Sequence, residues 1–554
     1  MKYDYLIAGG GIAGLYTAFC ILKHSPTARI CILEASNRLG GRLHSIPLEE
    51  GPIIEAGGAR FNTQQHRILA LIHHLGLDSR KVEITGNSRY IPINRDYDPQ
   101  LEVIFPEIDD IIQMLESHIH QHKISPTTLE KINLLELIHN TYSSKYPTIK
   151  KYIIARYPYY SELHTLNALE GLALFTHEFA NKTRYFVLAG GLEQLITKIQ
   201  HHLEQSPNVK IHLNTPLETI ARNIGLYSIT PHGGGGNVFQ AERVILALPQ
   251  PALTTIRYLT SRPGIRQLIN SVAPEPLYRI YARYPPDGGS GKVWFADMPK
   301  IVSNLSIKYI IPSNVEKGII MISYTDARFA RYWFKKLEAG EDILKKELAR
   351  QLKLLFPDVE IPTPLWIKHY YWDMGAGYWK PRCSRKELIP RITQPLEDEP
   401  IYVCNENYSS HQAWVEGSLE SADYVLAKLG IPGIGVISRT KHYNGKTLKN
   451  KPKHKQKHIH NKQLRNRMRG GGATKKWKTY TLAEVAKHNK KTDAWIAIDG
   501  KVADITEWIP KHPGGAVIMK GVGKDATALF TSIGHDEYAR KMLKKYQIGI
   551  LVEH

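Results

Sequence analysis

The feature that most constrains the fold is a glycine-rich turn near the N-terminus, Gly9-Gly10-Gly11-Ile12-Ala13-Gly14. It follows an apolar run typical of a buried strand, residues 4–8, and precedes residues 15–23, which hold helix-forming residues and no helix breaker. A second β-rich run, 29–33, comes next and ends at Glu34. The order predicts a βαβ unit of ordinary size.

Each residue of this unit has a specific use if the unit binds a dinucleotide. Gly9 permits the tight turn, Gly11 lets the backbone approach a pyrophosphate, and Gly14 allows close helix packing. The phosphates would then lie at the positive end of the helix. Glu34 follows Gly14 by twenty residues, where a carboxylate can accept hydrogen bonds from both ribose hydroxyls.

The rest of the first 430 residues predicts a mixed α/β protein. A chain of 554 residues is long enough for three or four domain-sized units. Four consecutive glycines, 233–236, lie between two strand-like runs and predict a hairpin loop. Strand-like and helical patterns recur along the chain: strands at 209–213, 244–248 and 319–324, and helices at 192–203 and 343–355.

From Glu34 to Arg42 the sequence reads EASNRLGGR, which resembles the ExxxRxGGR signature of the flavin-containing amine oxidases. Further parts of that family's pattern follow in order: EAGGAR at 55–60, LAGGL at 188–192, AERVILALP at 241–249 and WVEGSLESA at 414–422. The resemblance covers about residues 1–430. It implies an α/β FAD-binding Rossmann-type domain with an inserted α+β substrate domain.

The resemblance also implies which residues bind FAD. Glu406 falls in the usual Gly-Glu element beside the ribityl and phosphate arm, with Asn405 in place of the glycine. Leu217 takes the place of an apolar residue that contacts the adenine side, although an ordinary core position is an equal alternative. The expected cofactor-binding residues are Gly9, Gly11, Ala13, Gly14, Glu34, Arg42, Gly58, Arg60, Leu217, Glu406 and Val415.

Aromatic side chains are expected in front of the flavin ring. In residues 372–381 the resemblance points to Tyr378 and Trp379, and Trp414 matches the opposite wall. A poorly solvating pocket disfavours the ammonium form of an amine, and the free lone pair assists loss of hydride to flavin N5. Core positions are the alternative for these aromatics. The mammalian monoamine oxidases tether FAD through the cysteine of a Ser-Gly-Gly-Cys-Tyr element. The corresponding residues here, 375–378, contain no cysteine, so we expect non-covalent FAD.

Two arginines complete the expected catalytic set. Arg279 takes the place of a lysine that many relatives have near N5, which leaves the rate of reaction with O2 open because a guanidinium is always charged. L-amino acid oxidases and tryptophan monooxygenases resemble this sequence with an arginine at Arg60, which pairs with the substrate carboxylate. Bracing of the flavin or of a loop is the alternative for Arg60, so amine and amino acid both remain open.

Residues 478–549 resemble cytochrome b5, a separate small α+β domain. The first expected haem ligand is His512, in His512-Pro513-Gly514-Gly515, and the second is His535. The resemblance implies that these two imidazoles fill both axial positions of haem b, which favours electron transfer over oxygen binding.

Charge separates the two parts. Of the net charge of +21, fifteen Lys and Arg with no Asp or Glu fall within residues 439–478. Such a segment cannot bury enough apolar surface to fold alone, and it could bind nucleic acid or other polyanions weakly. We therefore expect a flavin domain at 1–435, a basic disordered linker at 436–476 and a haem-binding domain at 477–554.

Together these patterns predict an FAD-dependent oxidoreductase that oxidises the CH-NH or CH-NH2 group of a small amine or amino acid. Electrons would then pass to O2 or, one at a time through the haem, to a carrier protein. Two alternatives stay open: a desaturase-like FAD dehydrogenase, and a redox or structural protein that binds polyanions through the linker. Only four cysteines and no apolar run long enough to span a bilayer favour a soluble, cytoplasmic protein without a transmembrane segment.

Overall fold

The computed structural model describes residues 2–84, 88–93, 98–178, 183–223, 225–232, 238–434, 477–509, 515–532, 543 and 545–552. The chain divides into two compact units, residues 1–444 and 445–554. The glycines at 233–236 and the predicted linker at 436–476 lie outside the described residues. The polyanion-binding prediction depends on that linker and stays a prediction.

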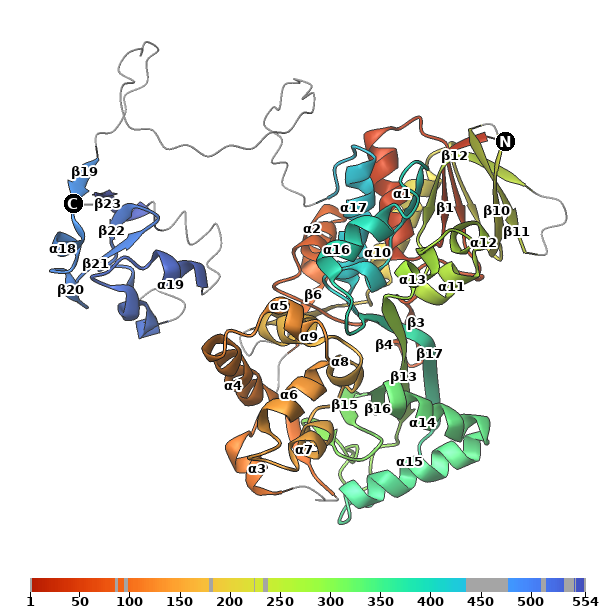
Figure 1. Cartoon of the computed structure of the whole chain (residues 1–554). Helices are drawn as coiled ribbons and strands as arrows, with labels where there is room; N and C mark the ends of the chain where they lie inside the picture. The colour runs from red at the N-terminus through yellow and green to blue at the C-terminus, as the bar shows by residue number, and fades with distance from the viewer. Residues whose placement is uncertain are drawn as a thin grey trace, which may run out of the picture. The chain divides into compact units, whose positions relative to one another are not determined.

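A seven-stranded mixed sheet forms the frame of the first unit (Figure 1). Its order is β10-β11-β12-β1-β2-β9, and β18 pairs with β12. Five strands are parallel, whereas β10 and β11 run antiparallel to their neighbours. The bounds are β1 Lys2–Ala8, β2 Ile30–Leu33, β9 Val209–His212, β10 Leu217–Asn223, β11 Leu226–Pro231, β12 Phe239–Leu246 and β18 Ile401–Val403.

Helices cover both faces of this sheet, which is why β1 reads as a nearly continuous apolar run. Ile7 packs into the core under one group of helices, whereas Leu6 and Ala8 pack into the core under the other. The first group is α1 Ile12–His24, α10 Gln194–Glu204 and α17 Val415–Lys428. The second is α11 Gln250–Thr255, α12 Arg257–Thr260, α13 Ile265–Ile269 and α16 Arg385–Thr393. The predicted Rossmann-type frame is confirmed.

A second sheet, of six strands, lies in the inserted part, in the order β17-β13-β16-β15-β14-β7. Two of its strands are long, β13 Val272–Arg283 and β17 Trp366–Trp379, and they pair antiparallel from Val272↔Trp379 to Arg283↔Trp366. Two helices pack on the sheet through a separate apolar core. The remaining bounds are β7 Ser88–Ile91, β14 Lys300–Ser303, β15 Tyr309–Asn314, β16 Ile319–Asp326, α14 Ala327–Glu338 and α15 Glu341–Leu355.

Seven helices between β2 and β9 surround their own core and complete the inserted α+β part. They are α3 Gln100–Ile104, α4 Ile108–Gln121, α5 Pro126–Leu129, α6 Leu134–Tyr142, α7 Ile149–Arg156, α8 Ser161–His164 and α9 Ala168–Ala173. Short strands and one helix connect this part to the frame: β3 Ser45–Pro47, β4 Ile53–Glu55, β5 Phe61–Asn62, α2 His66–His74, β6 Lys81–Ile84 and β8 Tyr185–Leu188.

The second unit is a small α+β fold around a five-stranded sheet, in the order β19-β23-β22-β21-β20. Ile496, Ile498, Val522 and Phe530 lie in its main core. The elements are β19 Lys478–Tyr480, α18 Leu482–Val485, β20 Asn489–Lys490, β21 Asp493–Ile498, β22 Lys501–Asp504, α19 Thr527–Ser532 and β23 Gln547–Leu551. Both predicted haem ligands, His512 and His535, lie outside the described residues.

Among the described helices of both units, none has the length and apolar character needed to cross a membrane.

Candidate active site

The glycine turn has one closed side and one open side. Gly9 has φ +107°, and a Cβ there would collide with the carbonyl of Ala247. A Cβ on Gly14 would collide with the carbonyl of Gly9, so α1 can approach the turn only because position 14 is glycine. A Cβ on Gly11, in contrast, would meet nothing within 4 Å. The backbone at Gly11 is therefore accessible to a ligand, and buried Ala13 follows it in α1.

Glu34 is fixed beside this turn at the end of β2. Its Oε2 accepts a hydrogen bond from the Gly10 backbone N–H at 2.7 Å, and its Oε1 accepts from the N–H and hydroxyl of Ser36 at 2.9 and 2.8 Å. Thr215 donates to the Glu34 carbonyl at 2.8 Å, which brings the start of β10, at half-buried Leu217, alongside. Because a carboxylate has about four lone-pair sites, Glu34 keeps acceptor capacity for a ribose.

Arg42, which follows β2, pairs with the buried Glu406 and also hydrogen-bonds to β17. Arg42 donates through Nη2 to Glu406 and through Nη1 to the Gly375 carbonyl at 2.9 Å. Glu406 also accepts from the Gly377 N–H at 3.1 Å. The side chain of Asn405 accepts from the Asn407 N–H at 2.8 Å, so the asparagine that replaces the family's glycine closes the turn itself.

Gly58 and Val415 adjoin one another, as expected for residues that contact one ligand. A Cβ on Gly58 would lie 3.9 Å from Cγ2 of Val415, which is the first residue of α17. Several of the cofactor residues predicted from sequence thus come from the glycine turn, from residues 42–58 and from the start of α17. The glycine cradle, Glu34 and the Arg42–Glu406 pair fit a dinucleotide such as FAD.

Arg60 lies in an aromatic cage. Its guanidinium carbon is 5.1 Å from the centroid of the Tyr185 ring and 5.6 Å from that of Trp414. The rings of Tyr185 and Trp414 stack on one another, with centroids 6.4 Å apart. Three further tyrosines are close enough to interact electrostatically with the guanidinium: Tyr159, Tyr309 and Tyr324. Within the part of the chain that the structure describes, no carboxylate lies within ion-pairing distance of Arg60.

Arg279 is a buried guanidinium in the inserted part. It lies on β13, donates through Nη1 to the Glu55 carbonyl at 2.8 Å, and is 4.6 Å from the centroid of the Tyr324 ring. Tyr281 donates to the same carbonyl at 2.9 Å. Tyr324 thus lies beside both arginines, and the position where relatives carry a lysine holds a fixed positive charge.

Tyr378 and Trp379 are neighbours at the end of β17, and their side chains leave the strand in opposite directions. Trp379 is only 1% exposed, its indole N–H donates to the Ser409 carbonyl at 2.8 Å, and it packs edge-on against Tyr408. This is the core position that we held open for it. Tyr378 lies instead near Glu162 and Asp326, in the inserted part.

Sequence reasoning missed these two acids. Asp326 accepts from the N–H groups of Tyr160 and Ser161, both at 2.7 Å, and from the Ser161 hydroxyl. Glu162 is 6% exposed and accepts from the Tyr157 hydroxyl at 2.5 Å. Burial raises the pKa of Glu162 to about 8. A dense aromatic stretch at 157–160 precedes Glu162, but no recognisable motif marks it.

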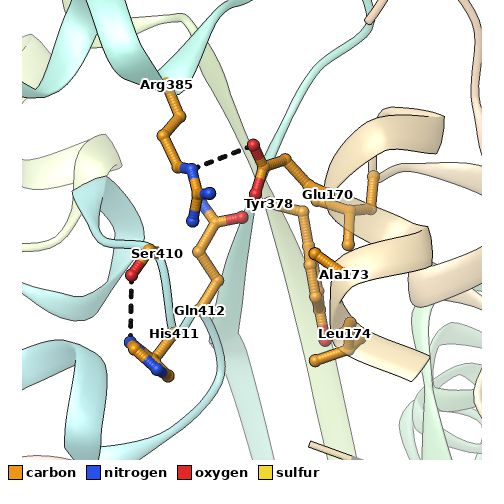
Figure 2. Close-up of a pocket in the computed structure, with 9 residues that line it drawn as sticks. Glu170, Ala173, Leu174, Tyr378, Arg385, Ser410, His411 and Gln412 are labelled. Atoms are coloured by element: carbon orange, nitrogen blue, oxygen red, sulfur yellow. Dashed lines mark hydrogen bonds and ion pairs between the residues drawn. The ribbon is translucent and has the colours of Figure 1, made fainter. Parts of the chain in front are cut away.

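Figure 2 shows a cavity of about 230 Å³ with Tyr378 in its wall. The ring of Tyr378 lies along Ala173 and Leu174. On the polar side, Nε of Arg385 is 3.0 Å from Oε1 of Glu170, and the hydroxyl of Ser410 is 3.0 Å from Nδ1 of His411. Of the residues predicted from sequence, only Tyr378 lines this cavity.

The described residues of the second unit contain no group of three or more His, Cys, Asp or Glu side chains that could hold a metal. They do supply an apolar core from Ile509, Val522 and Phe530. Apolar side chains of this kind are compatible with a porphyrin. The two histidines expected to bind its iron, His512 and His535, lie outside the described residues.

Two family models match the chain. Residues 12–425 match flavin containing amine oxidoreductases, and residues 481–552 match the cytochrome b5-like heme/steroid binding domain. The first match covers most of the chain, and the second agrees with the resemblance seen at the C-terminal end.

Solved structures with a similar fold include putrescine oxidase bound to putrescine and cyclohexylamine oxidase from Brevibacterium oxydans. The TM-score is 0.60 for each, at 17% and 16% identity, over 77% of this chain and 99% of theirs. At these identities the likeness shows the fold alone.

Curated relatives match a short stretch of the chain. A cytochrome b5 of Drosophila melanogaster is 51% identical over 77 residues, which are 14% of this chain and 58% of the relative. An acyl-lipid (8-3)-desaturase of Physcomitrium patens is 55% identical over 75 residues, 14% of this chain and 15% of the relative. The chain thus spans less than two thirds of the length of either.

Proposed function

Because the chain belongs to the flavin-containing amine oxidoreductase family and carries a cytochrome b5-like domain, we propose that it oxidises an amino acid at the C–H bond beside nitrogen. FAD, when bound, supplies the acceptor for the two electrons that leave this bond as hydride. We include in the proposal the layout of a flavin domain at 1–435, a linker at 436–476 and a haem-binding domain at 477–554.

The glycine turn and its partners would hold FAD. The open backbone at Gly11 lies at the N-terminus of α1, where a pyrophosphate is stabilised by unpaired N–H groups. Glu34 would accept hydrogen bonds from the ribose hydroxyls. The Arg42–Glu406 pair would lie beside the ribityl and phosphate arm. All these interactions are non-covalent.

The observation that carries the proposal is Arg60. Its guanidinium is surrounded by aromatic rings and, within the described residues, has no acidic partner. A half-buried charge without a partner loses hydration that nothing replaces, and a carboxylate matches the fork of a guanidinium with two parallel hydrogen bonds. A substrate carboxylate at Arg60 would supply the missing partner.

The rings of Trp414 and Tyr378 would exclude water from the amine of that substrate. Both side chains are buried. In such surroundings the neutral amine is favoured over the ammonium form, and its lone pair is then available as the C–H bond breaks. No separate side chain needs to act as a base.

The second unit would give the electrons a one-electron route. His512 and His535 would hold haem b, and the haem, when bound, would supply one-electron transfer toward a carrier protein, with O2 as the alternative acceptor.

Arg60→Gln tests the carboxylate assignment. We expect kcat/KM for amino acids to fall by about 10- to 100-fold, mostly through KM, because a charge-assisted hydrogen bond contributes roughly 1.5 to 3 kcal/mol. The amine made by removing the carboxylate from the same amino acid should lose little. Steady-state kinetics with such matched pairs gives the comparison.

Arg283→Gln is a matched control, because Arg283 is the last residue of β13 and already has an acidic partner, Glu50, at 2.9 Å. It should leave both substrates unchanged. Equal losses for amino acid and amine in Arg60→Gln would count against a carboxylate at Arg60.

A further inference from the structure

Glu162 is a second ionisable group whose hydrogen bonding in the described structure is incomplete. It is 6% exposed, and its Oε2 accepts one hydrogen bond, from Tyr157 at 2.5 Å. Its Oε1 has no hydrogen-bond donor among the described residues. An acid so deeply buried normally has several donors or a cationic partner.

The other buried acids nearby have more partners. Asp326 accepts from two backbone N–H groups and one hydroxyl. Glu170 pairs with Arg385, with Nε and Oε1 3.0 Å apart. Of these three acids, Glu162 is the one with a single hydrogen-bond donor and no cationic partner among the described residues, so it would gain most from a cationic ligand.

Glu162 and Arg60 are neighbours without being partners. Arg60 lowers the pKa of Glu162 through space, against the larger effect of burial, but no ion pair joins the two side chains. Tyr159 interacts with both of them. A guanidinium and a carboxyl group thus lie near the same tyrosine, in the same aromatic surroundings.

We propose that Glu162 binds a second, cationic nitrogen of the substrate, so that the substrate is a basic amino acid whose carboxylate pairs with Arg60 and whose distal ammonium pairs with Glu162. That such a substrate is oxidised rests on the proposed function, whereas its binding between Arg60 and Glu162 does not. A ligand with both charges would give a partner to half-buried Arg60 and to buried Glu162 at once, which an amino acid with an uncharged side chain cannot do.

Binding can be tested without turnover. The probes are 6-aminohexanoate and hexanoate, which share a carboxylate and differ by the distal ammonium, titrated against the FAD-loaded full chain and followed by flavin absorbance. We expect 6-aminohexanoate to bind roughly 30-fold or more tightly than hexanoate, as for a charged hydrogen bond in a buried site.

Glu162→Gln should remove this preference by weakening 6-aminohexanoate alone, and Glu162→Asp should restore part of it. Tyr157→Phe keeps the carboxylate and should keep the preference, and it serves if Glu162→Gln does not fold. Equal binding of the two probes by the unmodified protein, or equal loss of both in Glu162→Gln, overturns the proposal.

Turnover distinguishes this proposal from the proposed function. Lysine should reduce the flavin with at least about 30-fold higher kcat/KM than norleucine in the unmodified protein, and Glu162→Gln should abolish the difference. If 6-aminohexanoate binds with the expected preference but no amino acid reduces the flavin, the binding proposal is supported and the proposed reaction is wrong.

Discussion

Lys308 is a buried cation that the proposed reaction does not use. It is 1% exposed, its Nζ donates to the Ile154 carbonyl at 2.6 Å, and it lies 4.5 Å from the centroid of the Phe329 ring. Burial lowers the pKa of Lys308 to about 7. The lysine thus connects the β14–β15 loop to α7. Near pH 7 it is about half protonated in the folded chain.

This lysine should give the first unit a characteristic pH dependence. Between about pH 7 and 10.5 the unfolded chain keeps the proton on Lys308 while the folded chain has released it, so the free energy of unfolding due to this group rises with pH. The slope is at most about 1.4 kcal/mol per pH unit. Lys308→Met should remove this rise, as measured by urea unfolding of variant and parent across that range.

Lys345→Met is the control, because Lys345 pairs with Glu341 on the surface of α15. Its pH profile should follow that of the parent. A Lys308→Met profile parallel to the parent would mean that the lysine stays charged when folded.

At the scale of elements, the turn between β1 and α1 separates packing from binding. Gly14 is needed for the helix to reach the turn, whereas Gly11 has open space where its side chain would be. The glycine at position 14 is therefore needed for packing of α1, and the glycine at position 11 leaves room for the ligand.

A pair of alanine substitutions should separate these roles. Gly14→Ala forces α1 away from the Gly9 carbonyl and should lower Tm clearly, since overpacking costs about 1 to 3 kcal/mol. Gly11→Ala should leave the Tm of the FAD-free protein unchanged and weaken FAD binding. Thermal unfolding with and without FAD, together with the flavin content of the purified protein, measures both. Equal Tm losses would show that the two glycines act alike.

The dinucleotide-binding elements were predictable because their signals are local. The strand, the glycines, the helix and Glu34 fall within one stretch of chain, and the structure has β1, α1 and β2 there. The hairpin strands at 226–231 and 239–246 were likewise marked by the glycines between them.

The substrate side was less predictable, because its residues meet only through tertiary folding. Arg60 was predicted because it ends the EAGGAR element, but Tyr159, Tyr185 and Tyr324 come from three other segments of the chain and none of them is marked by its neighbours. Trp379 shows a different limit. Period-two alternation separates it from Tyr378, but both faces of the strand end are buried, so the sequence could not tell which face meets the cavity.

At the scale of the whole molecule, two redox units share one chain. If electrons pass from flavin to haem within the molecule, the effective concentration of the flavin at the haem is near millimolar, far above the protein concentration of an assay. In anaerobic stopped-flow experiments, haem reduction after flavin reduction should therefore have a rate constant that does not change over about a twentyfold range of protein concentration.

His535→Ala provides the control for this prediction, because it removes a predicted haem ligand in the second unit and should abolish the haem signal while flavin reduction continues. A haem reduction rate that rises in proportion to protein concentration would show that electrons move between molecules.

The long strands β13 and β17 connect the two layers of the first unit. One end of their pairing, at Val272 and Trp379, belongs to the core beneath the seven-stranded sheet, and the other, toward Ala282 and Ile367, belongs to the core of the inserted sheet. Arg279 and Tyr378 are carried on these same strands. A hinge between the two layers would have to bend this pair of strands, whose register shifts between Glu275 and Leu277. We therefore expect admission and release of small molecules to depend on rotation of individual rings such as Tyr378.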